Sequence, residues 1–285
     1  MGVEATPSRR SQSFVEAVRA QIDRPWFLTI LAATALCAAY LLGALFNWGH
    51  TAERSLYSNL GLLPVGLAAT LLAWCAARSQ LDRRSRTAWR LLSASFGCFF
   101  AGDLLFFVYQ NVLGKSPFPS LADVGYLAYY PLMFAGLVCL PSPGRNRGRR
   151  GLLSVDLAVL LLAGGALVVY VYLIPTLGSP RDDFLAYSLS AGYPIGDLLL
   201  LAGLATLLVR RGARHIHVSL VVLGSGLLLG LGADVVYGYQ TIHGALQAGG
   251  LSDAGYMLSW ILFAWASYVE FAQANREHPE DDVPE

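Results

Sequence analysis

Five aspartates stand within, or at the start of, stretches of sequence that are otherwise apolar. An ionised carboxylate inside the hydrocarbon layer of a membrane costs about 2.5–3.5 kcal/mol on insertion scales, so such residues usually face a cavity or a partner. These carboxylates are therefore the first candidates for a functional site. The five residues are Asp103, Asp123, Asp197, Asp234 and Asp253.

Aromatic residues recur at helical spacing from these aspartates and so share a helix face with them. A phenol on the same face can donate a hydrogen bond to the carboxylate. We therefore add these residues to the candidate ligand-binding set. They are Tyr126 and Tyr130 with Asp123, Tyr256 and Trp260 with Asp253, Tyr237 with Asp234, and Tyr193 one turn before Asp197.

Two interpretations of these residues are open. In the first, they are hydrogen-bond ties between helices, together with tyrosines of the interfacial aromatic belt. Asp123 and Asp253 fit this interpretation because they lie near the membrane boundary. In the second, Asp103, Asp197 and Asp234 line a polar cavity that opens to the outside and binds a ligand.

Other chemistries find little support. The only lysine, Lys115, lies between apolar stretches, which excludes a retinal Schiff base inside a membrane helix. The five histidines lie at the ends of apolar stretches or outside them, and the four cysteines occur singly, so neither set predicts a metal or haem site. We expect no cofactor and no catalytic activity.

The elements that must position these side chains are long apolar segments. The 285 residues are 55% hydrophobic and only 14% charged, against about 25% charged in soluble proteins. Stretches of about 20 apolar residues are long enough to cross a bilayer, and in lipid such a segment forms a helix. The sequence predicts an all-α polytopic membrane protein with eight transmembrane helices. The eight stretches are 26–46, 56–77, 88–110, 121–141, 152–174, 186–209, 216–240 and 251–271.

Basic residues are distributed unequally between the two sides of these stretches. Seventeen of the twenty Lys and Arg residues fall on one side, counting both ends of the chain. By the positive-inside rule that side is cytoplasmic, so we expect both termini in the cytoplasm. These arginines orient the helices, and they give no reason to expect nucleic-acid binding.

The chain repeats itself with a period of about 130 residues. SLADVGY at 120–126 returns as GLSDAGY at 250–256, and GDLLFFVYQ at 102–110 returns as ADVVYGYQ at 233–240. We therefore expect two parallel four-helix repeats, at 26–141 and 152–271, between a cytoplasmic segment at 1–25 and an acidic, disordered tail at 272–285. Asp197 has no counterpart, because the first copy carries Leu67 there. A costly acid without a counterpart favours a site over a scaffold contact.

Several motifs resemble the multi-span N-terminal sensor region of bacterial membrane-bound diguanylate cyclases of the GGDEF type. The strings that carry the resemblance are PSLADVGYLAYYPL, SVDLAVLLLA, AGYPIGDLLLLAGL and GLGADVVYGY. The resemblance covers about 26–271 and implies a bacterial inner-membrane protein that passes a signal to a cytoplasmic domain or partner. It also implies a homodimer, because GGDEF active sites form between two catalytic domains. No GG[DE]EF string occurs in this sequence.

The leading expectation is a sensory module that lies in the lipid bilayer and takes a small polar or cationic ligand, or protons, from the outer side. A small-solute or ion transporter is the first alternative, since duplicated halves and buried acids are common in transporters. The acids crowd the outer half and the centre of the membrane, however, which suggests a blind cavity and favours the sensor. A structural membrane assembly protein is the second alternative.

Overall fold

The computed structural model describes residues 51–79, 81–141, 184–211, 217–245 and 249–276, together with Ala35, Ala39 and a few positions between 158 and 174. Six α-helices make up most of these ranges, and a short π-helix, η1 (Val108–Val112), continues the second of them. The helices are α3 (Thr51–Arg78), α4 (Arg83–Phe107), α5 (Ala122–Cys139), α8 (Phe184–Arg211), α9 (Val218–Ile242) and α10 (Leu251–Arg276).

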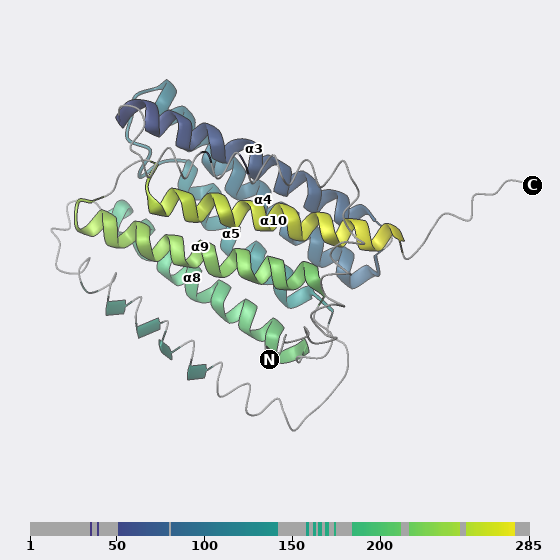
Figure 1. The fold of residues 1–285 in the computed structure, drawn as a ribbon. Helices are drawn as coiled ribbons and strands as arrows, with labels where there is room; N and C mark the ends of the chain where they lie inside the picture. Colours follow the sequence, from purple (N-terminus) through teal and green to yellow (C-terminus); the bar gives the residue numbers. More distant parts are fainter. Residues whose placement is uncertain are drawn as a thin grey trace, which may run out of the picture.

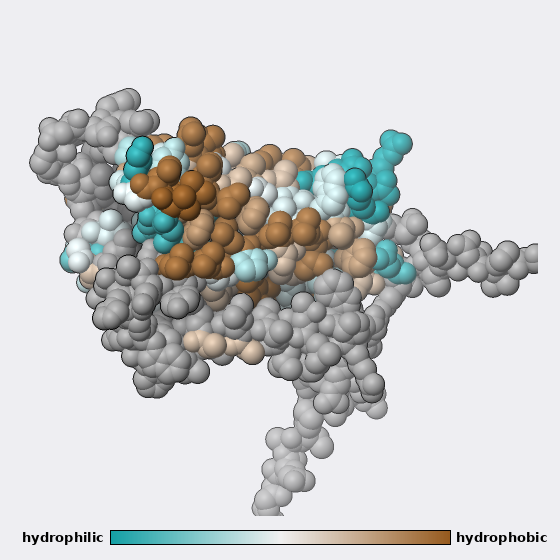
Figure 2. All heavy atoms as spheres, turned by 90° about the horizontal axis from the view of Figure 1, so that it is seen from above, coloured by the Kyte–Doolittle hydropathy of each residue, from teal (hydrophilic) through white to brown (hydrophobic). Residues whose placement is uncertain are grey.

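Six of the eight apolar stretches predicted from the sequence are helices in the structure. Four of them are long and apolar enough to cross a membrane: Ser58–Arg78, Arg83–Val112, Ala122–Cys139 and Val218–Thr241. A shorter apolar segment, Gly192–Leu208, lies in α8. The segments 1–25 and 277–285, the stretch 26–46 apart from Ala35 and Ala39, and more than half of the stretch 152–174 lie outside the described residues. Figure 2 shows one face of the molecule, on which hydrophobic side chains gather between two more hydrophilic ends.

Polar side chains define the ends of several helices. Asp82 caps α4 by accepting hydrogen bonds from the backbone N–H groups of Arg84 and Ser85, at 3.0 and 3.3 Å. Hydrogen bonds from the Ser85 side chain and from these N–H groups hold the pKa of the Asp82 carboxyl below its usual range, against the opposing effect of burial. The last helix, α10, continues to Arg276. Residues 272–276 are therefore helical and do not belong to the disordered tail that the sequence predicts.

The helices pack as a series of neighbours in which segments far apart in the sequence lie side by side (Figure 1). Helix α4 packs against α3 and α5, and α10 packs against α9 and α3. Helix α5 also packs against α8. The order of neighbours is therefore α9, α10, α3, α4, α5, α8, and the two ends of this series, α8 and α9, touch only lightly.

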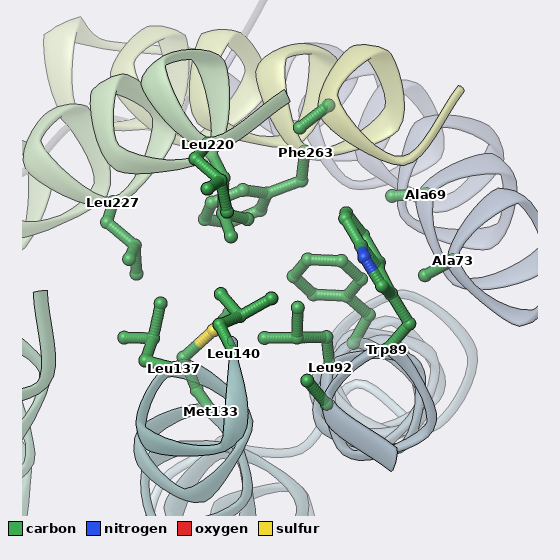
Figure 3. Packing of buried hydrophobic residues seen from close by; sticks show 14 of the residues in the cluster. Ala69, Ala73, Trp89, Leu92, Met133, Leu137, Leu140, Leu220, Leu227 and Phe263 are labelled. Atoms are coloured by element: carbon green, nitrogen blue, oxygen red, sulfur yellow. The ribbon is translucent and has the colours of Figure 1, made fainter. Parts of the chain in front are cut away.

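Apolar side chains from all six helices fill much of the bundle interior, and Figure 3 shows part of this cluster. Trp89 and Leu92 of α4 lie beside Met133 and Leu137 of α5, and all four are fully buried. Further members converge from α3, α9 and α10: Ala69, Ala73, Leu220, Leu227 and Phe263. We call this group the apolar core.

Small residues let neighbouring backbones approach closely, as is common between helices in membranes. A Cβ added at Gly125 of α5 would lie 2.5 Å from the carbonyl oxygen of Cys98 and 2.9 Å from the backbone nitrogen of Gly102, both in α4. A Cβ added at Gly196 of α8 would lie 2.5 Å from the Tyr130 ring of α5. Gly196 thus stands opposite the candidate residue Tyr130, and Gly125 lies against Gly102, the residue before Asp103.

Candidate ligand-binding site

Two of the aspartates accept a hydrogen bond from a tyrosine on the neighbouring helix. The Tyr126 hydroxyl of α5 donates to Asp103 Oδ1 of α4 at 2.9 Å. The Tyr256 hydroxyl of α10 donates to Asp234 Oδ1 of α9 at 2.7 Å. In each case the tyrosine belongs to the helix that follows the aspartate in the chain, so the two contacts have the same form.

These contacts correct the expectation that each phenol donates to an aspartate on its own helix face. Side chains one turn apart on a helix project side by side from its surface, so a rigid phenol extends past the carboxyl of its own helix. It reaches instead a carboxyl on the helix packed opposite. Tyr126 was grouped with Asp123 and Tyr256 with Asp253, but their hydroxyls reach Asp103 and Asp234.

Asp197 of α8 is brought to the same region. Its carboxyl is in hydrogen-bonding contact with the Tyr130 hydroxyl of α5 and with the carboxyl of Asp234 of α9. Asp197 and Asp234 thus form a carboxyl pair between two helices that otherwise touch only lightly.

Two carboxyl oxygens of this group are buried without a hydrogen-bond partner. Within the part of the chain that the structure describes, Asp103 Oδ2 and Asp197 Oδ1 meet no donor. Buried polar atoms are normally satisfied, so unsatisfied ones in a native protein call for an explanation such as a catalytic role, a water or an ion. Neither Asp103 nor Asp197 lines the cavity described below, so these oxygens lie behind its wall.

Asp123 serves a different purpose, because it closes a capping box at the start of α5. Its Oδ2 accepts from the Ser120 backbone N–H at 2.7 Å, while Ser120 Oγ accepts from the Ala122 N–H at 3.1 Å. Its Oδ1 accepts a short hydrogen bond from the Tyr193 hydroxyl of α8. Asp123 therefore fixes the helix start and ties α5 to α8.

Asp253 has the corresponding position at the start of α10. Its Oδ2 accepts from the Gly249 backbone N–H at 2.7 Å and from Ser58 Oγ of α3 at 2.7 Å. It therefore ties α10 to α3 while it stabilises the first turn of its own helix. These partners favour the first of the two interpretations for Asp123 and Asp253, that of hydrogen-bond ties between helices.

A small cavity lies next to Asp234. Its volume is about 30 Å³, enough for about one or two water molecules. The polar groups on its wall come from Asp234, Tyr129, Tyr130, Tyr256 and Ser259. The remaining lining residues are Phe99, Leu200, Leu227, Gly230, Leu231, Trp260 and Phe263.

The structure thus brings together part of the set expected from the sequence. Asp234, Tyr130, Tyr256 and Trp260 line the cavity, and Asp197 contacts two of them. Asp103 does not line the cavity, but its hydrogen-bond partner Tyr126 packs edge-on against Phe99, a residue of the cavity wall. Tyr129, also on the wall, packs edge-on against the same Phe99 ring. Tyr237 is 38% exposed and does not line the cavity.

Sequence reasoning missed several lining residues. Phe99, Phe263 and Leu227 resemble ordinary core residues, and only the packing of α4, α9 and α10 shows that they enclose a polar space. Tyr129 could have been noticed as a second tyrosine beside Tyr130. Ser259 is one residue before Trp260, and its hydroxyl donates to the Gly226 carbonyl at 2.8 Å.

The candidate aspartates of α4, α5, α9 and α10 lie toward one end of the bundle, whereas Asp197 lies near the middle of α8. In α4, Trp89 of the apolar core precedes Asp103 by fourteen residues, about 21 Å along the helix. The antiparallel helix α5 has the reverse order, from Asp123 to Leu137. We call the opposite end of the bundle, where α3 and α8 end and α4 and α9 begin, the core end. There the Ser219 hydroxyl of α9 donates to Glu270 Oε2 of α10 at 2.6 Å.

Comparison of this chain with protein-family models, with curated proteins and with solved structures finds no match. Function must therefore be argued from the site itself.

Proposed function

We propose that this chain is a membrane-embedded sensory module whose cavity, reached from the outer side, binds a small ligand beside Asp234 and Asp197. The observation that carries the proposal is that the cavity beside Asp234 adjoins the apolar core, with which it shares Leu227 and Phe263, while the fully buried Trp89, Leu92 and Met133 belong to that core and do not line the cavity. A carrier needs a polar path that can open to either side in turn. The tightly packed apolar core favours a site with one entrance.

The orientation follows from the arginines at the core end of the bundle. Arg78 ends α3, Arg83 and Arg84 begin α4, and Arg210 and Arg211 end α8. By the positive-inside rule this end faces the cytoplasm, and the end that carries the aspartates of α4, α5, α9 and α10 faces outward. We propose an inner-membrane protein with eight spans and both termini in the cytoplasm.

The repeated contacts support two four-helix repeats related by a pseudo-twofold axis. Tyr126 with Asp103 and Tyr256 with Asp234 occupy corresponding places in the two copies. The ties that cross between copies also correspond, since α8 contacts the start of α5 and α3 contacts the start of α10. The cavity itself is asymmetric, because it draws on Asp234 and is completed by Asp197.

Helix α10 is the element suited to carry a signal. It contributes Tyr256, Ser259, Trp260 and Phe263 to the cavity wall and then runs on to Arg276 at the core end. A ligand that shifts these side chains would move the whole helix, since a helix transmits displacement along its axis. The receiver is a cytoplasmic signalling domain or partner protein, as in the sensor regions of diguanylate cyclases that the motifs resemble, and the module acts as a dimer.

Cysteine accessibility tests the single entrance. In a variant in which Cys37, Cys75, Cys98 and Cys139 are replaced by serine or alanine, Ser259→Cys places a thiol on the cavity wall. We expect Ag⁺, a thiol-reactive cation small enough for a cavity of about 30 Å³, to react with this thiol in right-side-out vesicles and not in inside-out vesicles. Modification from both sides would contradict the blind cavity and favour a transporter.

A flux measurement supplies the matching control. Proteoliposomes that contain the full chain are expected to show no counterflow of labelled amines, amino acids or alkali cations above that of empty liposomes. Counterflow of any of them would replace the sensory proposal by a carrier.

A further inference from the structure

The cavity wall combines aromatic rings with a carboxyl group, and this combination points to the class of ligand. Six of the lining residues are aromatic: Phe99, Tyr129, Tyr130, Tyr256, Trp260 and Phe263. Their rings meet edge to face, with centroids 5.1 Å apart for Phe99 and Tyr129, 5.3 Å for Phe99 and Trp260, and 5.7 Å for Trp260 and Phe263. The faces of such rings carry partial negative charge and attract cations.

One carboxyl group lies on this wall and a second adjoins it. Asp234 Oδ1 is held by the Tyr256 hydroxyl at 2.7 Å, and its carboxyl contacts that of Asp197. Asp197 Oδ1 is buried and meets no donor within the described ranges. No lysine or arginine is among the residues that line the cavity. The pair therefore offers acceptor capacity that a donor carrying positive charge would satisfy.

Other ligand classes fit this wall poorly. Anions would be repelled by the carboxyl pair, and an apolar molecule would leave the unpartnered oxygen of Asp197 buried. Magnesium and calcium require about six to eight oxygen ligands, and aromatic rings supply none. Among the described residues no group of three or more His, Cys, Asp or Glu side chains is placed to hold a metal ion.

We propose that the cavity recognises a small protonated amine, of the size of ammonium or methylammonium, through its N–H donors on the Asp234 carboxyl, which Asp197 adjoins from outside the wall, and through its charge on the surrounding rings. The volume of about 30 Å³ sets the size limit. This inference rests on the proposed function, since it names the ligand class of the same site. It adds that the positive charge of the amine is recognised both by the carboxyl group and by the faces of the aromatic rings.

The test uses the full chain in lipid nanodiscs and methylammonium chloride as the probe, titrated against sodium chloride at constant ionic strength. Because Trp260 forms part of the wall, we expect a saturable change in tryptophan emission and a saturable rise in Tm. Potassium and tetramethylammonium are run in parallel. A response to potassium equal to that of methylammonium would reassign the cavity to inorganic cations and overturn the proposal.

Variants separate the two parts of the recognition. Asp234→Asn is expected to weaken methylammonium binding more than about tenfold. Phe99→Leu keeps an apolar side chain but removes a ring face, so we expect binding about two- to thirtyfold weaker. Glu270→Gln, at the core end of α10, is the matched control and should leave binding unchanged. If Asp234→Asn fails to fold, Phe99→Leu alone decides, and unchanged binding in that variant contradicts the aromatic recognition.

The two proposals fail in different experiments. Absence of any saturable response to amines in folded protein, with Ser259→Cys still modified from one side only, overturns the amine inference and leaves the sensory cavity standing. Amine binding together with modification from both sides retains the ligand class and overturns the sensory function.

Discussion

At the scale of single residues, the five aspartates divide into two kinds. Asp123 and Asp253 accept backbone N–H groups at helix starts and side-chain hydroxyls from another helix. Asp103 and Asp234 accept a phenol inside the bundle, and Asp197 pairs with Asp234. The first kind has the partners of a structural contact. In the second kind, Asp103 and Asp197 each keep one oxygen that meets no donor among the described residues, which is acceptor capacity that a structural contact would normally use.

Removing one phenol tests the structural part of these contacts. Tyr126→Phe leaves Asp103 without the only donor that the structure shows for it, so the protein should lose about 0.5–2 kcal/mol of stability. The measurement is reversible unfolding in mixed micelles with a denaturing detergent. Tyr239→Phe is the control, because Tyr239 is 55% exposed, and it should change stability by less than about 0.5 kcal/mol. Equal losses in the two variants would contradict the role of the Tyr126 hydroxyl.

At the scale of helices, close contact between backbones determines which side chains meet. Gly125 of α5 lies against Cys98 and Gly102 of α4, and this approach brings the Tyr126 hydroxyl within reach of Asp103. Gly196 of α8 lies against the Tyr130 ring in the same way, next to Asp197. Small residues thus place the carboxyls as well as packing the helices.

Gly125→Ala tests this packing. Its Cβ would meet backbone atoms of α4 at 2.5 and 2.9 Å, and backbone cannot move aside as a flexible side chain can. We expect a loss of more than about 2 kcal/mol in unfolding free energy, at the upper part of the range for overpacking. Gly232→Ala is the control, because a Cβ there meets nothing within 4 Å, and it should be neutral or stabilising by up to about 1 kcal/mol. A Gly125→Ala protein as stable as Gly232→Ala would show that α4 and α5 are not in close contact.

At the scale of the whole molecule, the bundle is polar at one end of its interior and apolar at the other. Helix α10 passes through both parts, packed between α9 and α3. The cavity side chains of α10 lie near its start and middle, while its last turns lie beside the apolar core. A displacement at the cavity would therefore be measurable at the far end of the helix.

Spin labels at the core end measure this displacement. Arg83 of α4 and Asn275 of α10 are exposed and suit a label pair, whose distance should change by about 1–2 Å or more on addition of methylammonium. Asp234→Asn should abolish the change. The pair at Arg78 and Arg90, on α3 and α4, is the control and should keep its distance. A constant Arg83–Asn275 distance with demonstrated amine binding would contradict signal transmission through α10.

The helices and their membrane character could be read from the sequence alone, because both depend on local properties. Runs of about 20 apolar residues leave the backbone no regular structure other than the helix in lipid, and six of the eight predicted stretches are helices in the structure. The start of α5 was equally local, since SLAD holds both members of a capping box within four residues. The aspartates could be identified from the sequence for a similar reason, because a carboxylate within an apolar segment costs free energy.

The partners of the aspartates depended on the tertiary structure. Periodicity along one helix shows which residues share a face, but the helix opposite that face is selected by packing between distant segments. The helical spacing therefore grouped Tyr126 with Asp123, whereas in the structure its hydroxyl donates to Asp103. The pairing of Asp197 with Asp234, and the enclosure of a cavity by Phe99, Trp260 and Phe263, arise only when α4, α8, α9 and α10 pack together. Local chemistry determined the helices and their charges, and the packing of those helices determined the site.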